Sequence, residues 1–275
     1  MMVTWVAAFV LLLFQDRASA MQSVVFNSYL AFICFAVDRI VARGTLSSTE
    51  FCARSPLPTL VARAGIVIGT VAFVSFVYGF IANWVVYVPV LTDLWRQWVQ
   101  WKPPLGDSAV PNLLLYALIP GGGVIALGAS PRTFGFGTSA RGTARALAPC
   151  LALPAIFFTL FLATGRMSIG GLAYILARNF LSSGFSEEVL FRGLLFSHLR
   201  PWMNSDVSLV VQAVAFALFH LASSLNEPSP IALVAYLVAL NVIPGYLFGM
   251  VAQRTRSLAI PVAVHTSVNM MRNSF

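Results

Sequence analysis

The sequence predicts an all-α, polytopic integral membrane protein with about 7–8 transmembrane helices. Of its 275 residues, 59% are hydrophobic and only 9% are charged, whereas about a quarter of the residues in a soluble domain carry a charge. The mean hydropathy of +0.84 points the same way. Short polar segments separate apolar runs, most of which approach the length of about 20 residues that crosses a bilayer as a helix. This composition excludes a cytosolic enzyme, a disordered tail and a nucleic-acid-binding module.

The first twenty residues contain an apolar run at positions 3–14. Ala18 and Ala20 resemble the small residues before a signal-peptidase site, but no basic residue precedes the run, so a cleaved secretory signal is a poor match. We expect either a short membrane-associated segment here or an extension upstream of a start at Met21.

The rest of the N-terminal half continues this pattern. Within residues 1–146 we expect transmembrane helices joined by an interfacial segment, with spans at residues 24–37, 65–91 and 112–128, the last of which contains three consecutive glycines. The segment 92–111 places Trp95, Trp98 and Trp101 at helical spacing among charged residues. Tryptophans near charges favour a helix that lies in the headgroup layer.

The C-terminal half, residues 147–275, is predicted to pack with the first half as one membrane domain. Its apolar segments are residues 146–165, 168–199, 207–222, 230–251 and 258–271. The segment 168–199 would form a helix of about 48 Å, which exceeds the hydrocarbon core of about 30 Å. We therefore expect two helices or one bent helix, broken near residues 182–186, with Ser186 as the N-cap of the second part.

The net charge of +8 comes from basic residues that are scattered singly, so it does not indicate nucleic-acid binding. Arginines concentrate in alternate loops, namely residues 39–63, 141–145, 200 and 254–256, if the segment 168–199 crosses once. The loop 223–229 carries no basic residue. The positive-inside rule would then place the arginine-rich loops in the cytoplasm.

Glu187 and Glu188 are adjacent and lie inside an apolar segment, although the whole chain has only nine acidic residues. An ionisable side chain in a membrane segment costs at least about 2.5 kcal/mol, which makes it a candidate for function. Glu188 and Arg192 are four residues apart, so they share a helix face and can pair. Glu187 is rotated by about 100° from that face, which leaves it as the free carboxylate and a candidate general base.

Two further pairs of polar or aromatic residues have the same four-residue spacing. Phe216 precedes His220 on one apolar segment, and His265 precedes Asn269 on the last one. An imidazole and a carboxamide on one face can together hold a carbonyl oxygen. Each pair alone could be structural, since a buried histidine is more often a hydrogen-bonded core residue and Phe216 could simply pack. Three such pairs in a chain with so few charges favour a shared site.

Other reactive side chains have simpler interpretations. His198 lies beside Arg200 near a helix end and is expected to be interfacial. Cys34, Cys52 and Cys150 have no paired spacing, so we expect apolar packing and neither disulfides nor a cysteine zinc site.

The three pairs resemble the motifs of the CPBP family of intramembrane proteases. Glu187, Glu188 and Arg192 resemble its EExxxR motif, Phe216 and His220 its FxxxH motif, and His265 and Asn269 its HxxxN motif. This family includes the Ras-converting-type CAAX prenyl proteases, lysostaphin-resistance-like proteins and bacteriocin self-immunity proteins, the Abi-type members. The resemblance covers roughly residues 147–275 and implies a CAAX-protease-like catalytic core.

The resemblance implies peptide hydrolysis in a buried cavity that the helices enclose. Glu187 would activate a water with help from His220, while His265 and Asn269 would form the oxyanion hole. Glu188 and Arg192 would support these residues, and Phe216 would shape the pocket wall. The site would need no metal or other cofactor. The alternative is a zinc site in which Glu187, His220 and His265 are the ligands.

The expected activity is that of an intramembrane endopeptidase that cuts near the C-terminal tail of a membrane-associated protein or peptide. Family members are often described as metalloendopeptidases, and here a glutamate-type protease is expected. The partners would be such a substrate, with a C-terminal processing segment, and the lipid bilayer, but no nucleic acid. The expected location is the bacterial cytoplasmic membrane.

Two other functional classes remain open. The chain could be a non-catalytic membrane protein of the same family that binds a partner or confers immunity. It could also be a transporter coupled to ions or protons, with broken helices at residues 121–123 and 244–245, although the sequence shows no inverted repeat.

Overall fold

A computed structural model describes residues 2–15, 17–41, 55–78, 109–136, 141–225 and 229–272. These residues form helices and turns and contain no strand, which confirms the all-α prediction. Five described helical segments are long and apolar enough to cross a membrane: Ser19–Ile40, Leu57–Phe76, Ala109–Ala126, Thr143–Ala163 and Pro230–Thr255. The protein is therefore a polytopic integral membrane protein, as its composition predicts.

The N-terminal residues form two helices that pack onto the C-terminal half of the chain. α1 (Met2–Gln15) places Ala8 and Leu12 against α13 (Pro230–Leu237), and these two residues are almost fully buried. α2 (Arg17–Ile40) contacts α8 (Thr143–Ala163) and α14 (Ile243–Thr255). The apolar run expected to be membrane-associated is thus part of the packed helical domain.

A second group of helices lies on the other side of the molecule. α3 (Leu57–Ala72) continues as the π-helix η1 (Phe73–Tyr78) and packs against α7 (Ile119–Ala126). α6 (Ala109–Asn112) and the π-helix η3 (Leu113–Leu118) lead into α7 without a break, so its three glycines lie inside a helix. The Trp-rich segment expected to be interfacial, apart from its last three residues, and the end of the span expected at 65–91 are outside the described residues.

The long segment 168–199 is helical from Ile169 to Leu199, so the alternative of two separate helices with a break near residues 182–186 is wrong. It comprises α9 (Ile169–Asn179), η5 (Phe180–Gly184), α10 (Phe185–Glu188), η6 (Val189–Leu195) and α11 (Phe196–Leu199). The π-helical turns η5 and η6 lie inside this helix, and η5 overlaps the residues at which we expected the break. Ser186 is not the N-cap of a helix, because the backbone before it is already helical. Its hydroxyl donates a hydrogen bond to the Leu181 carbonyl.

The remaining helices complete the C-terminal half. α12 (Ser205–Phe219) packs against α14, which the π-helix η8 (Val238–Val242) joins to α13, and α15 (Ala259–Arg272) ends the described chain. Gly245 and Gly249 are four residues apart on α14 and face α12; a Cβ at Gly249 would lie 2.7 Å from Leu209 Cδ2. Small residues at this spacing allow membrane helices to approach closely.

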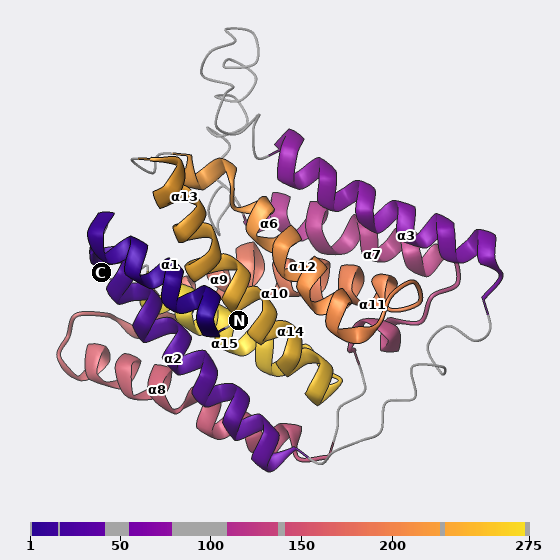
Figure 1. Ribbon diagram of the computed structural model, residues 1–275. Helices are drawn as coiled ribbons and strands as arrows, with labels where there is room; N and C mark the ends of the chain where they lie inside the picture. The colour runs from indigo at the N-terminus through magenta and orange to yellow at the C-terminus, as the bar shows by residue number, and fades with distance from the viewer. Residues whose placement is uncertain are drawn as a thin grey trace, which may run out of the picture.

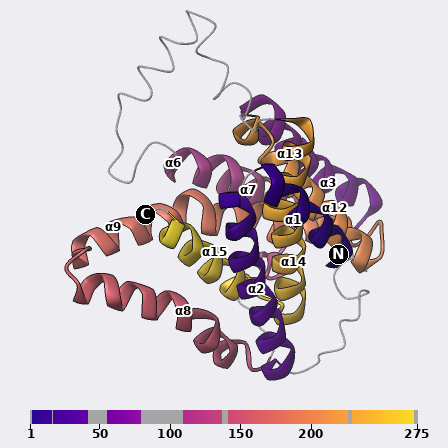
Figure 2. The ribbon, with the colours of Figure 1, turned by 60° about the vertical axis from the view of Figure 1, so that its left-hand side comes forward.

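Two hydrophobic clusters flank α10. One joins η6 to α3, η3 and α7, and includes Leu190, Phe191 and Leu194, which are completely buried. The other joins α2, α8, α14 and α15. Figure 1 shows α10 between these two groups of helices, and Figure 2 shows α15 between α8 and α9, both of which it contacts. The two adjacent glutamates therefore lie in the interior of the bundle.

Candidate active site

Glu187 and Glu188 are both buried in α10, with 6% and 0% of their surface exposed. α10 can lie against α15 because Gly184 has no side chain: a Cβ there would fall 2.0 Å from Thr266 Oγ1 and 3.0 Å from Thr266 Cα. This close approach brings the glutamates next to the histidine of α15. The small residue at position 184 therefore allows two buried carboxylates to lie where two helices meet.

Glu188 Oε1 has two partners. It accepts a hydrogen bond from Arg192 Nη1 at 3.0 Å and lies 2.8 Å from His265 Nδ1. The pair with Arg192 is the one that the four-residue spacing predicts. The contact with His265 spans 77 residues of sequence and was not predicted. Glu188 therefore joins the first and third motifs through one oxygen.

Arg192 is fully enclosed by polar and aromatic partners. Its guanidinium carbon lies 4.4 Å from the centre of the Phe216 ring and 5.4 Å from that of Phe248. Its Nη2 donates to the Gly245 carbonyl at 3.3 Å. Cation–π contacts and the ion pair with Glu188 both stabilise the buried charge. Phe216 is thus more than a pocket wall, because it also covers the arginine.

Glu187 Oε2 faces the imidazoles of two different helices. It lies 3.9 Å from His220 Nε2 and 3.8 Å from His265 Nε2. Oε2 is buried and accepts no hydrogen bond from a described residue. The structure thus brings together the carboxylate that we predicted to be free and the two histidines that we predicted to work with it.

His220 follows directly after α12, and its ring orientation is fixed by the backbone. Its Nδ1 lies 2.9 Å from the Phe216 carbonyl, which only accepts, so Nδ1 carries the hydrogen and Nε2 is the acceptor on the Glu187 side. The hydroxyls of Ser223 and Ser224 donate to the His220 carbonyl at 2.9 and 2.8 Å. These bonds satisfy the end of the helix and hold His220 in place.

His265 and Asn269 share a face of α15 but have different partners. The His265 ring stacks on Phe248, with centres 5.5 Å apart and an angle of 18°. Asn269 Nδ2 donates to Ser183 Oγ at 2.8 Å, and this hydroxyl donates to the Asn179 carbonyl at 3.1 Å. The π-helical turn η5 therefore supplies the residue that orients the Asn269 carboxamide.

Three residues of this site were missed in the sequence, namely Ser183, Gln212 and Phe248. Gln212 is completely buried, and its Nε2 donates to the Gly245 carbonyl at 2.8 Å, the same oxygen that Arg192 contacts. A signal was present for Gln212, since it stands four residues before Phe216 and eight before His220 on one helix face. Nothing in the local sequence marks Ser183 or Phe248.

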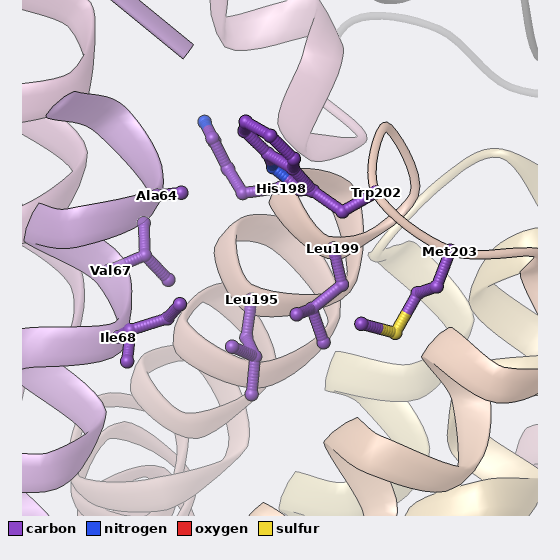
Figure 3. A pocket seen from close by; sticks show the side chains of 8 residues that line it. All are labelled: Ala64, Val67, Ile68, Leu195, His198, Leu199, Trp202 and Met203. Carbon is purple, nitrogen blue, oxygen red and sulfur yellow. The ribbon is translucent and has the colours of Figure 1, made fainter. Parts of the chain in front are cut away.

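His198 is separate from this site. Its Nδ1 lies 2.8 Å from the Leu194 carbonyl, and its ring lies 5.9 Å from that of Phe134. It lines an apolar cavity of about 220 Å³ between α3 and α11, together with Trp202 and Met203 (Figure 3). Cys150 is a buried free thiol, Cys34 is a partly buried one, and Cys52 is outside the described residues.

The zinc alternative requires Glu187, His220 and His265 to surround one ion. Among the described residues, no group of three or more His, Cys, Asp and Glu side chains is arranged to hold a metal ion. His265 directs its Nδ1 to Glu188 and its Nε2 to the Glu187 side, and a carboxylate on the second ring nitrogen is also usual for a metal-binding histidine. The arrangement combines a carboxylate and an imidazole acceptor, which can serve acid–base chemistry, with a carboxamide that can donate hydrogen bonds.

Comparison with known proteins finds one family model that matches the C-terminal part of the chain. Residues 169–271 match the family model described as type II CAAX prenyl endopeptidase Rce1-like. No curated protein and no solved structure matches the chain. The matched region begins at α9, ends in α15 and contains all three motifs, so these residues are similar to an Rce1-like domain. The resemblance to the CPBP family is confirmed over these residues.

Proposed function

We propose that this protein is an intramembrane endopeptidase that uses Glu187 as the general base. The Rce1-like domain supports a CAAX-type intramembrane protease at the level of the family. The observation that carries the finer assignment is the buried Glu187 oxygen, which faces the Nε2 atoms of both His220 and His265 at 3.9 and 3.8 Å. These distances are too long for direct hydrogen bonds, and a water can bridge polar groups at such separations.

In the proposed reaction, a water between Glu187 and His220 loses a proton to the Glu187 carboxylate. The His220 Nε2 atom accepts a hydrogen bond from the same water and orients it, because Nδ1 is bonded to the Phe216 carbonyl. The resulting hydroxide attacks the scissile carbonyl carbon and forms a tetrahedral oxyanion. Glu187 then returns the proton to the leaving amine, so that one water and one peptide bond become a carboxylic acid and an amine.

The oxyanion would be held by Asn269 and His265. Asn269 uses one N–H for Ser183 and retains the other for the substrate. His265 donates its Nδ1–H to Glu188, so its Nε2 becomes a donor only when the ring gains a second proton. Glu188 stabilises that imidazolium, as a buried carboxylate does for the histidine of a catalytic triad. Glu188 is therefore proposed as a positioning residue and Arg192 as its counter-charge.

The proposed substrate is a membrane-associated protein or peptide with a C-terminal processing segment. His220 lies at the end of α12, and the helix begins near the arginine-rich end of α14, where Gln253 Nε2 donates to Ser205 Oγ at 2.6 Å. If that end faces the cytoplasm, as the positive-inside rule predicts, His220 lies towards the opposite side. We propose the bacterial cytoplasmic membrane as the location and an exported, membrane-anchored tail as the substrate.

The substrate can be identified by comparing protein termini in membranes of a null strain complemented with wild type, Glu187→Gln or Asp206→Asn. Asp206 is exposed in the first turn of α12 and provides a matched carboxylate-to-amide control. We expect one set of precursors to stay uncleaved with the null allele and Glu187→Gln, and to be processed with the other two. Normal processing by Glu187→Gln and His220→Ala would favour a non-catalytic or transport function instead.

A further inference from the structure

Three apolar helical segments end at the same level of the molecule, away from Glu187. The segment Ser19–Ile40 ends where Thr143–Ala163 begins, and Gly142 lies so close to Ile40 that a Cβ at Gly142 would be 2.5 Å from the Ile40 carbonyl oxygen. Thr143 Oγ1 donates to the carbonyl of Thr255, the last residue of Pro230–Thr255, at 3.4 Å. Because these segments are candidate membrane spans, we expect their shared end to lie at a boundary between the hydrocarbon and headgroup layers.

Arginines from two of these helix ends surround one cavity at this boundary. Arg39 in the last turn of α2 and Arg141 and Arg145 at the start of α8 line a cavity of about 440 Å³. Figure 1 shows the end of α2 beside the start of α8. Sites for small ligands usually have volumes of about 300–1,000 Å³. The cavity is therefore large enough for a phosphorylated headgroup.

The charges around this cavity are not neutralised by the described part of the protein. Arg39 stacks over Phe35, with its guanidinium carbon 5.0 Å from the ring centre. Asp38 is the neighbouring acid, but its carboxylate is 3.0 Å from Arg254. No carboxylate of a described residue forms an ion pair with Arg39, Arg141 or Arg145. The three arginines that line the cavity therefore have no carboxylate partner among these residues.

The start of α8 adds hydrogen-bond donors to these charges. Gly142 is its N-cap, with φ of 94°, and no side chain caps the helix. The first backbone N–H groups of a helix attract anions, and arginine binds phosphate oxygens in a bidentate manner. Because the cavity lies at the ends of membrane spans, the phosphate of a lipid is better placed to reach it than a soluble phosphate.

We propose that this cavity binds the phosphate group of an anionic lipid in the leaflet on the arginine-rich side. The occupant is a phosphatidylglycerol-like phosphodiester, whose negative charge the three arginines neutralise and whose acyl chains lie along α2 and α8. The site is independent of the proposed protease activity, because it lies at the ends of the spans and shares no residue with the motifs.

The test uses the purified full-length protein in a neutral detergent at constant ionic strength. The probes are dioctanoyl phosphatidylglycerol, dioctanoyl phosphatidylcholine and inorganic phosphate, and native mass spectrometry gives the binding constants. The triple variant Arg39→Gln, Arg141→Gln, Arg145→Gln should bind phosphatidylglycerol on the order of 100-fold more weakly, since each arginine near a membrane surface contributes about fivefold. The charge-matched control replaces the exposed Arg132, Arg166 and Arg178 with Gln.

We expect the control variant with three substitutions to bind phosphatidylglycerol as tightly as the wild type does. Both proteins should bind phosphatidylglycerol more tightly than phosphatidylcholine. Each single Arg→Gln variant should lose about fivefold, which keeps the test decisive if the triple variant does not fold. An equal loss of affinity for phosphatidylglycerol in both triple variants would overturn the proposal, because it would show that the lipid responds to the overall surface charge. Inorganic phosphate that binds as tightly as the lipid would overturn the lipid assignment, and unchanged binding in all variants would exclude the site.

Discussion

Glu188 Oε1 serves two hydrogen-bond donors, and this shared oxygen links the chemistry of the site to its stability. Arg192 and His265 both contact it, at 3.0 and 2.8 Å. The positions of the guanidinium and of the imidazole therefore both depend on one carboxylate oxygen. Glu187, on the adjacent position, remains free to take a proton because Arg192 is already engaged. Two neighbouring glutamates thus have different tasks because their partners differ.

Arg192→Gln should destabilise the folded protein by about 3–5 kcal/mol, because it leaves Glu188 as a buried charge that only His265 can neutralise. Unfolding of the purified protein in detergent, followed by circular dichroism, measures this loss. Arg132→Gln removes an exposed arginine and should change stability by less than about 0.5 kcal/mol. Equal stability of Arg192→Gln and wild type would show that the buried pair is not structural.

Ser183→Ala should lower kcat by roughly tenfold or more and leave KM nearly unchanged, since it frees the Asn269 carboxamide from its only described hydroxyl partner. Ser183→Thr keeps the hydroxyl and should restore most of the rate. Ser267→Ala removes another hydroxyl of α15, which bonds to the Ala263 carbonyl, and serves as the control. A loss of kcat that threonine does not rescue would assign Ser183 a packing role only.

Local spacing predicted some of these contacts and missed others for a physical reason. Glu188 and Arg192 lie on one helical turn, so their pairing follows from helix geometry alone. The contacts of His265 with Glu188 and of Asn269 with Ser183 depend on how α15 packs, 77 and 86 residues away in sequence. The spacing therefore indicated which side chains belong to the site, but not which partner each one has.

At the scale of the elements, the π-helical turn η5 and Gly184 determine how α15 meets the glutamates. The helix is not interrupted near residues 182–186, because the polar, glycine-containing residues there form a π-helical turn, which is wider than an α-helical turn. The Ser183 hydroxyl on this turn reaches Asn269, and Gly184 admits Thr266. The sequence marked the irregular position correctly, but its conformation depends on tertiary packing.

Gly184→Ala should reduce both stability and cleavage, because the new Cβ would overlap Thr266 Oγ1 and crowd its backbone. Overpacking of this kind typically costs about 1–3 kcal/mol and would displace His265 from Glu188. Gly170→Ala on the same helical run meets no atom within 4 Å and provides the matched control. Thermal unfolding and cleavage rates of the two variants should differ; identical behaviour would show that α15 does not need this close approach.

At the scale of the whole molecule, hydropathy predicted where the spans lie, since every described span overlaps an expected apolar run. The span Leu57–Phe76 nevertheless begins before the expected start at residue 65, so Arg63 lies inside α3 and is buried, and its place in the expected loop 39–63 is wrong. The charge pattern predicts that Arg39, Arg141 and Arg145 lie on one side of the membrane, and these three residues line one cavity. The packing of the helices could not be predicted from the sequence. Apolar side chains cover every face of each span, so few residues indicate which helix lies next to it. α1 against α13 is one such pairing that only the structure reveals.

Cleavage by the purified protein should persist after dialysis against a chelator of divalent metals, because the proposed reaction needs only side chains and water. The measurement is the rate of precursor cleavage before and after treatment, with a known zinc protease as the positive control for chelation. If activity disappears and zinc restores it, Glu187, His220 and His265 would have to be reconsidered as metal ligands.

The central claim, that Glu187 activates the attacking water, is tested most directly by single-turnover cleavage of an identified precursor. The account predicts that Glu187→Gln lowers the rate by about 10²–10⁴-fold, the usual contribution of a general base, while the protein remains folded and Asp206→Asn cleaves normally. A folded Glu187→Gln protein that cleaves within a few-fold of the wild-type rate would contradict it.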